Sequence, residues 1–219
     1  MVVGHRGETE RHPENSLAAI LAALEGVGAA EVDIRVSADG QLVLAHDAEV
    51  RGRQIAGSTW AELAELRRDG HPICLLDEVL ALPGRLDLEV KNLPFQAEFD
   101  DSGRPALLVA SRARPGDIVT SFYWPDMELV RRRAPEVATG LRVADPGLME
   151  AALEHASEMG HVAVASEDPL VEADWCRRAI EAGLEIRYGP STAPIGLVSC
   201  INSARRRSFP MFPENYVTT

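Results

Sequence analysis

The sequence has few cysteines, no long apolar run and no excess of positive charge, and each of these absences excludes a class of protein. The three cysteines, Cys74, Cys176 and Cys200, are odd in number and far apart. They match neither a zinc-binding spacing nor a disulfide framework. We therefore expect them to be ordinary thiols in or near the core.

No stretch approaches the roughly 18 apolar residues that a membrane span requires. The apolar start, Met1-Val2-Val3, is too short for a signal peptide. We therefore expect a cytoplasmic protein without an integral membrane segment. The 22 Lys and Arg residues against 34 Asp and Glu residues give a net charge of −12, which disfavours binding to nucleic acid and to anionic membranes. An anionic substrate would need local help, from a metal or from individual Arg and Lys side chains.

What is present is a regular alternation of short apolar runs and helical stripes. With 219 residues, 46% hydrophobic and 26% charged, the chain has the composition of a globular protein. We predict strands at Met1–Gly4, Ala30–Val36, Gln41–Ala45, Arg85–Lys91, Asp117–Phe122, Ala138–Val143, His161–Ala165 and Leu184–Tyr188. We predict helices at Glu14–Gly26, Trp60–Leu66, Leu75–Leu82, Pro105–Ala113, Pro125–Ala134, Pro146–Met159 and Val171–Ala182.

This α/β alternation predicts a parallel sheet with helical crossovers. Seven strand–helix steps favour a closed (β/α)₈ TIM barrel over an open doubly wound sheet, and barrels of this size form single domains. We therefore expect one domain over residues 1–219, with a short insertion after the second strand. The C-terminal segment is atypical, and we place its last strand at Tyr216–Thr219.

Polar side chains gather at the ends of several predicted strands, where a barrel carries its active site. His5 and His46 each follow a strand, and Glu31 and Asp33 lie on one face of the strand between them. Glu89 and Lys91 share the polar face of another strand. In a barrel that face points inward, where a buried acid and base must be paired, hydrogen-bonded or bound to a metal.

These residue types suit metal-assisted acid–base chemistry on a phosphate ester. Three carboxylates without a cysteine favour Mg²⁺ or Ca²⁺ over zinc. Arg6 can form a forked contact with phosphate oxygens, and Lys91 can act as a point charge. The two histidines can divide the proton transfers, with one taking a proton from the nucleophile and the other giving one to the leaving group.

The ordered motifs extend this interpretation to a family. Along the chain stand Gly4-His5-Arg6-Gly7, Pro13-Glu14-Asn15-Ser16, Glu31-x-Asp33, Asp39-Gly40, His46-Asp47 and Leu88-Glu89-Val90-Lys91. Together they resemble the glycerophosphodiester phosphodiesterase family, whose fold is a (β/α)₈ barrel. The resemblance implies that His5 and His46 are the acid and base. It implies that Glu31, Asp33 and Glu89 bind the metal, and that Arg6 and Lys91 contact the phosphate.

The resemblance also implies the reaction, which is hydrolysis of a glycerophosphodiester to glycerol 3-phosphate and an alcohol. The sequence departs from the family at the seventh strand, where Leu184–Tyr188 replaces a Trp-Thr-x-Asn motif. Phe122 and Trp124 follow a strand end and are candidates either for an apolar substrate wall, with Phe122 in contact with substrate, or for the core.

Two alternatives stay open at this point. One is a lysophospholipase D that acts on larger lipids, and the other is a barrel that binds phosphodiesters without turnover. The remaining four histidines lack a motif and are expected at the surface or at helix ends; they are His12, His71, His155 and His161.

Overall fold

The computed structural model describes residues 3–166 and 173–188. Within them a sheet of seven strands has the order β11-β10-β9-β8-β7-β1-β2. Its strands are β1 (Ala29–Val36), β2 (Leu42–Leu44), β7 (Arg85–Val90), β8 (Ile118–Ser121), β9 (Ala138–Val143), β10 (Ala163–Ser166) and β11 (Glu185–Tyr188). All neighbours pair in parallel except β2, which returns antiparallel to β1. The parallel sheet and its crossovers confirm the predicted class of fold.

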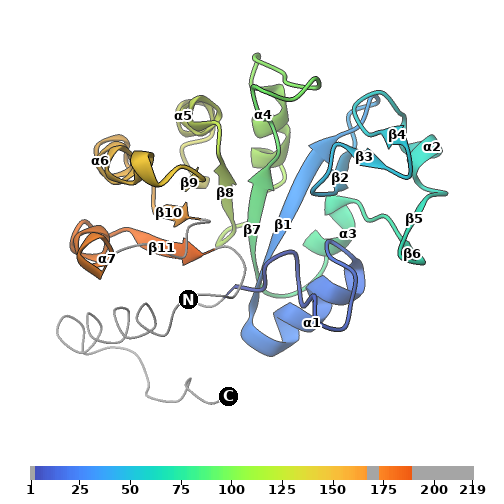
Figure 1. Ribbon diagram of the computed structural model, residues 1–219, viewed down its shortest axis with the longest axis horizontal. Helices are drawn as coiled ribbons and strands as arrows, with labels where there is room; N and C mark the ends of the chain where they lie inside the picture. The colour runs from blue at the N-terminus through green and yellow to red at the C-terminus, as the bar shows by residue number, and fades with distance from the viewer. Residues whose placement is uncertain (1–2, 167–172, 189–219) are drawn as a thin grey trace.

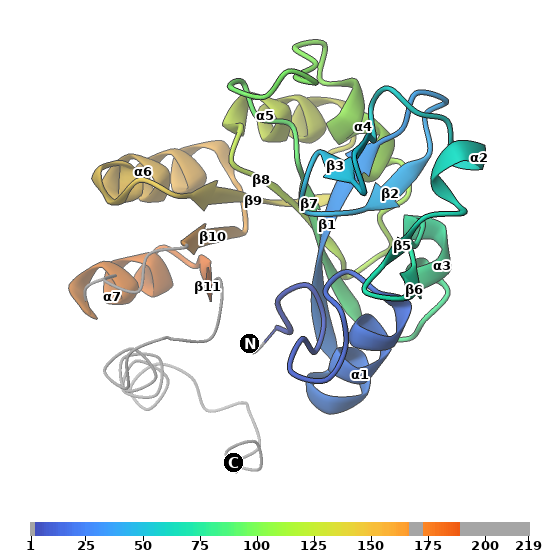
Figure 2. The ribbon, with the colours of Figure 1, turned by 45° about the vertical axis from the view of Figure 1, so that its right-hand side comes forward.

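Helices connect the strands and cover the outer face of the curved sheet (Figures 1 and 2). They are α1 (Leu17–Val27), α4 (Arg104–Ala110), α5 (Trp124–Arg133), α6 (Met149–Met159), which a 3₁₀ turn at Pro146–Leu148 precedes, and α7 (Ala173–Glu181). The segment between β2 and β7 holds small elements: α2 (Trp60–Leu63), α3 (Leu76–Leu80), and the hairpins β3 (Glu49–Val50) with β4 (Arg53–Gln54) and β5 (Arg67–Arg68) with β6 (His71–Pro72). This is the short insertion that the sequence predicts after the second strand.

Strand alternation divides the interior into an apolar layer and a polar centre. On β7, Leu86, Leu88 and Val90 belong to the main hydrophobic cluster between sheet and helices, whereas Asp87 and Glu89 point to the opposite face. Burial of each such leucine contributes about 1.5–3 kcal/mol. The apolar layer therefore holds the strands in register and fixes the charged side chains of the other face.

The N-terminal strand and the closure of the barrel are only partly described. Gly4 bridges to Ala30 in parallel, which places the segment before His5 beside β1, as predicted. The described residues contain no pairing between this segment and β11, so the sheet is open along that edge. The predicted last strand, Tyr216–Thr219, lies outside the described residues.

The first helix ends later than the sequence predicts. Gly26 was expected to end it, but α1 continues to Val27 and ends at Gly28, whose φ of 77° is left-handed and whose N–H donates to the Leu24 carbonyl. A glycine adopts that conformation without steric cost. At the other end Ser16 caps the helix by accepting from the Ala19 amide.

No helix within the described residues is long and apolar enough to cross a membrane. Cys74 and Cys176 are buried, as expected of core thiols, and burial raises the pKa of the Cys74 thiol to about 11. Cys200 lies outside the described residues.

Candidate active site

Three buried carboxylates meet on the inner face of the sheet. Glu31 and Asp33 project from β1, and Glu89 projects from β7, where it pairs in register with Asp33. One oxygen atom from each lies within 4.8 Å of the others. The structure therefore brings together the three residues that the sequence singles out as metal ligands.

Lys91 offsets part of this negative charge. Lys91 Nζ lies 2.8 Å from Glu89 Oε1 and 3.4 Å from Asp33 Oδ1. Two buried oxygens of the cluster, Glu31 Oε1 and Asp33 Oδ1, accept no hydrogen bond from any described residue. Unsatisfied buried acceptors are costly, and an oxygen-rich set of this kind fits a hard divalent cation.

The carboxylates of Glu31 and Asp33 have opposite pKa shifts. Burial and the adjacent Asp33 charge raise the pKa of Glu31 well above its usual value. Burial acts in the same direction on Asp33, but the charges of Lys91 and Arg6 hold its pKa below the usual range. The cluster is thus under electrostatic strain that an additional positive charge would relieve.

His5 lies beside the cluster, with its Nε2 4.0 Å from Glu31 Oε2. Burial and the Arg6 charge lower the pKa of His5 to about 4. The ring is therefore neutral at pH 7 in this environment, and its nitrogen is available to accept a proton.

His46 follows β2 and is held from two sides. Its Nδ1 is 2.8 Å from Asp47 Oδ1, a contact that orients the ring. Its backbone carbonyl accepts from Arg35 Nε and Nη2 at 2.9 and 2.6 Å. The same guanidinium donates to Gln96 and Glu98 of the loop after β7, so Arg35 ties that loop to the histidine.

The loop after Gly4 supports the carboxylates from the other side. Arg6 Nε is 3.0 Å from Asp33 Oδ2, and Arg6 Nη1 is 2.7 Å from Glu14 Oε2. The Asn15 side chain donates to Asp33 Oδ2 and accepts from the Asp33 amide. Arg6 and Asn15 both have positive φ, so the loop is bent tightly enough to bring these groups over β1.

A pocket of about 370 Å³ opens beside the cluster. Its polar wall includes His46 and Lys91, and its apolar wall includes Leu93, Phe95 and Phe122. Lys91 Nζ lies 5.8 Å from the Phe122 ring centroid. The pocket thus joins the cationic edge of the site to an apolar surface, and Phe122 is part of its lining.

Trp124, the other aromatic candidate, has a different position. Its Nε1 donates to the Arg142 carbonyl, and its ring stacks on His155. It therefore packs in the helical layer rather than in this pocket, so of the two alternatives left open for Trp124 the structure favours packing.

Three further charged residues belong to the centre and were missed by motif reasoning. Arg142 from β9 reaches Glu89 Oε2 at 3.0 Å and Glu31 Oε1 at 3.4 Å. Arg187 from β11 lies 3.0 Å from Asp87 Oδ2, and Asp87 also accepts from the Thr120 hydroxyl. The available signal was an arginine that alternates with apolar residues in each of two strands, beside Leu141 and Val143 in β9 and beside Ile186 in β11, because a buried arginine requires a partner.

Of the motif-free histidines, which are expected at the surface or at helix ends, His161 follows the end of α6 and donates its backbone N–H to the Ala156 carbonyl, and its side chain is fully buried. His155 is partly exposed. Both lie on the outer side of the sheet, away from the carboxylate cluster.

A parallel α/β barrel sheet with a carboxylate–histidine centre at its inner face is suited to metal-assisted hydrolysis. The sequence profile of the Glycerophosphoryl diester phosphodiesterase family matches residues 5–188. The chain belongs to this family and is thus a phosphoric diester hydrolase with a TIM-barrel fold, as the motifs predicted.

Individual proteins agree with this assignment. A probable glycerophosphodiester phosphodiesterase 1 of Mycobacterium tuberculosis is 29% identical, over 78% of this chain and 73% of the relative. A glycerophosphodiester phosphodiesterase structure from Thermotoga maritima has a TM-score of 0.71 at 25% identity, covering 94% of this chain and 91% of its own. An Oleispira antarctica phosphodiesterase in complex with the product sn-glycerol-3-phosphate has a TM-score of 0.77 at 19% identity, covering 94% and 96%.

Proposed function

We propose that this chain hydrolyses glycerophosphodiesters to glycerol 3-phosphate and an alcohol, with a divalent cation held by Glu31, Asp33 and Glu89. The observation that carries the proposal is the convergence of the three carboxylates, in which two buried oxygens, Glu31 Oε1 and Asp33 Oδ1, accept no hydrogen bond from the described residues and have a cation only at 3.4 Å. A structure that buries such oxygens without donors is suited to a ligand that supplies positive charge.

Mg²⁺ or Ca²⁺ fits the donor set, because all three side chains offer oxygen atoms. When bound, the cation would supply charge neutralisation for the phosphodiester. Lys91 and Arg6 add fixed positive charge at the same site, which a chain of net charge −12 needs in order to attract an anion.

The two histidines would divide the proton transfers. A glycerol hydroxyl adjacent to the phosphodiester attacks phosphorus, and one histidine takes its proton. The bond from phosphorus to the departing alcohol oxygen breaks, and the other histidine protonates that oxygen. Water then opens the resulting cyclic phosphate, with the histidine roles reversed, and glycerol 3-phosphate leaves.

Two features of the molecule and one relative support this assignment. His5 and His46 come from different strand ends, and each has an acidic neighbour: Glu31 lies 4.0 Å from His5 Nε2, and Asp47 lies 2.8 Å from His46 Nδ1. The product complex of the Oleispira antarctica phosphodiesterase contains sn-glycerol-3-phosphate, the product proposed here. The cytoplasmic location stays a prediction from the sequence.

A second candidate function, lysophospholipase D activity on larger lipids, is favoured by the pocket wall. Leu93, Phe95 and Phe122 line one side of it, and Phe95 is 83% exposed. An acyl chain could lie against this surface while the phosphodiester occupies the cationic edge.

The test is an assay of chelator-treated protein with Mg²⁺ or Ca²⁺ restored. Glycerophosphocholine and lysophosphatidylcholine are compared in parallel. We expect metal-dependent release of glycerol 3-phosphate from the first, lost in His5→Ala and retained in His155→Ala, a histidine on the outer side of the sheet. Choline release from the second substrate alone would establish the lipid alternative. Binding of glycerophosphocholine without turnover would establish a non-catalytic barrel.

A further inference from the structure

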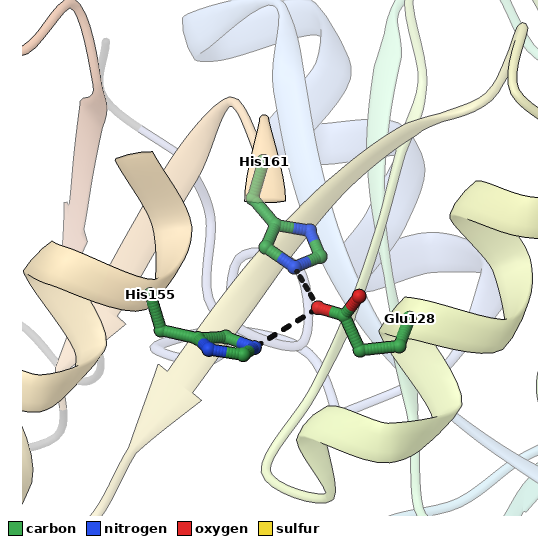
Figure 3. A group of neighbouring side chains, drawn as sticks. All are labelled: Glu128, His155 and His161. Atoms are coloured by element: carbon green, nitrogen blue, oxygen red, sulfur yellow. Dashed lines mark hydrogen bonds and ion pairs between the residues drawn. The ribbon is translucent and has the colours of Figure 1, made fainter. Parts of the chain in front are cut away.

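Three potential metal ligands meet in the helical layer, away from the carboxylate cluster (Figure 3). Glu128 comes from α5, His155 from α6, and His161 from the turn that leads into β10. Both imidazole rings direct Nε2 to the same carboxylate oxygen, Glu128 Oε1, at 3.0 Å from His155 and 2.8 Å from His161. Three separate elements therefore direct two imidazole nitrogens and one carboxylate oxygen to a common point.

The His161 ring is fixed behind that point. Its other nitrogen, Nδ1, lies 2.7 Å from the Thr139 hydroxyl, and its side chain is fully buried. Histidine ligands of metals characteristically use their second ring nitrogen in a hydrogen bond of this kind, which fixes the orientation of the ring. His161 is thus held with Nε2 facing Glu128.

His155 is held by a ring stack in addition to its contact with Glu128. Its ring lies parallel to Trp124 at 5.6 Å between centroids, and it faces the His161 ring at 6.1 Å. The side chain is 36% exposed, and that of Glu128 is 13% exposed. One side of the group is therefore accessible to solvent, and the other is closed by protein.

The alternation of β9 separates this group from the active site. Thr139 and Arg142 are three positions apart on the strand. Their side chains therefore point to opposite faces of the sheet. Arg142 contacts the carboxylate cluster, and Thr139 contacts His161. The two groups of potential ligands lie on opposite sides of one strand.

We propose that Glu128, His155 and His161 form a second metal site, which binds a divalent transition metal such as Zn²⁺. Two imidazole nitrogens with one carboxylate oxygen are a typical zinc donor set, and water can complete a tetrahedron from the exposed side. Imidazole nitrogen selects against Mg²⁺ and Ca²⁺, so this site and the all-oxygen cluster on the inner face differ in the metals that they prefer.

The proton balance of binding follows from the hydrogen bonds. Without metal, each Nε2 carries a hydrogen and donates it to Glu128 Oε1. Coordination uses the Nε2 lone pairs, so the ring proton of each histidine moves to Nδ1, where the Thr139 hydroxyl can accept it from His161. A neutral ring is the ligating form, and burial already lowers the pKa of His161.

The expected consequence is structural. A metal here would link α5, α6 and the start of β10, three elements that otherwise meet through side-chain packing. Because the unfolded chain holds these ligands apart, binding would stabilise the folded state. This inference does not depend on the proposed phosphodiesterase mechanism.

The test is titration of chelator-treated full-length protein with Zn²⁺ in the presence of millimolar Mg²⁺. We expect the wild type to bind one more zinc ion per chain than His155→Ala or Glu128→Gln, with His12→Ala as a matched histidine control that binds like the wild type. At about a hundredfold excess over the dissociation constant, zinc should raise the unfolding temperature by roughly 5–10 °C. Both site variants should lose this shift.

Replacing zinc with Co²⁺ gives a second readout, because visible absorption of the tetrahedral ion should appear in the wild type and be absent in His155→Ala. His155→Ala changes a partly exposed residue, so the test does not depend on a variant of the buried His161. Equal zinc stoichiometry in the wild type, His155→Ala and Glu128→Gln would overturn the proposal. So would the absence of Zn²⁺ binding, which would leave Glu128 as a hydrogen-bonded bridge between two rings.

Discussion

The guanidinium of Arg142 lies 3.0 Å from the carboxylate of Glu89, inside the ring of strands and among the candidate metal ligands. It also approaches Glu31 and Asp87, at 3.4 and 3.6 Å. Burial opposes its charge, but the surrounding Glu89 and Asp87 carboxylates raise the pKa of Arg142 above its ordinary value. Arg142 is therefore a permanent cation that offsets the charge of the buried carboxylates.

Replacement of Arg142 by Met should destabilise the protein by about 3–5 kcal/mol when a chelator is present, because buried carboxylates lose their partner. Mg²⁺ should restore part of that loss by supplying positive charge to the same oxygens. Urea unfolding with and without Mg²⁺ measures both effects. As a control, Arg178→Met removes exposed ion pairs with Glu150 and Asp174 and should cost little in either condition. If Mg²⁺ does not reduce the loss of stability in Arg142→Met, then Arg142 and the metal do not neutralise the same carboxylates.

His46→Ala should lower kcat by about 10² to 10⁴, the usual contribution of one general acid or base. Asp47→Asn keeps the His46 ring but replaces the carboxylate that contacts Nδ1 with a neutral amide. We therefore expect a smaller loss of kcat. Steady-state kinetics on glycerophosphocholine, with thermal unfolding to confirm the fold, make the comparison. A change below tenfold in His46→Ala would indicate a structural role.

Arg35 is a positioning residue, because it holds the His46 carbonyl and the loop around Glu98 with a single fork. Lysine keeps the charge but cannot make both sets of contacts. Arg35→Lys should therefore lower kcat by roughly tenfold to a hundredfold with a smaller change in KM. Glu98→Gln retains an acceptor for the same contact and should be milder. If Arg35→Lys and Glu98→Gln lower kcat equally, then the forked contacts of the Arg35 guanidinium do not position His46.

Asp126 should make stability depend on pH. Burial raises its pKa from 3.8 to about 6, against the favourable hydrogen bond from Asn92. The folded protein therefore binds this proton more tightly than the unfolded chain does, so stability falls as pH rises from about 4 to about 6.

Asp126→Asn removes that titration and keeps an acceptor for Asn92. We expect the variant to gain about 1–3 kcal/mol relative to the wild type between pH 4 and pH 7, measured by urea unfolding at both pH values. Asp101→Asn, a change at an exposed neighbouring carboxylate, is the control and should show no such gain. If the free energy of unfolding has the same pH dependence in Asp126→Asn and in the wild type, then Asp126 does not have a raised pKa in the folded protein.

The sequence predicted the parts of this molecule that depend on local pattern. Alternation on Arg85–Lys91 placed Glu89 inside and Leu88 in the core, and both are there. The ordered motifs also predicted that Glu31, Asp33 and Glu89 would meet, because parallel strands bring their ends to one edge.

What the sequence could not predict depends on contacts between distant strands. Arg142 and Asp87 are 55 positions apart, and nothing local indicates that β9 brings the arginine to the acidic cluster. His155 and His161 carry no motif, and only the packing of α5 against the sheet brings Glu128 to both. In each case the partner of a buried charge comes from tertiary structure.

The central claim is that Glu31, Asp33 and Glu89 hold the catalytic cation. The most direct measurement is the anomalous difference map of a crystal soaked in Mn²⁺, compared between the wild type and Glu31→Gln. We expect one peak in contact with all three carboxylates, and we expect this peak and glycerol 3-phosphate release to be weakened or lost in the variant. A wild-type map without a peak at these carboxylates, in crystals of protein that is active with Mn²⁺, would contradict it.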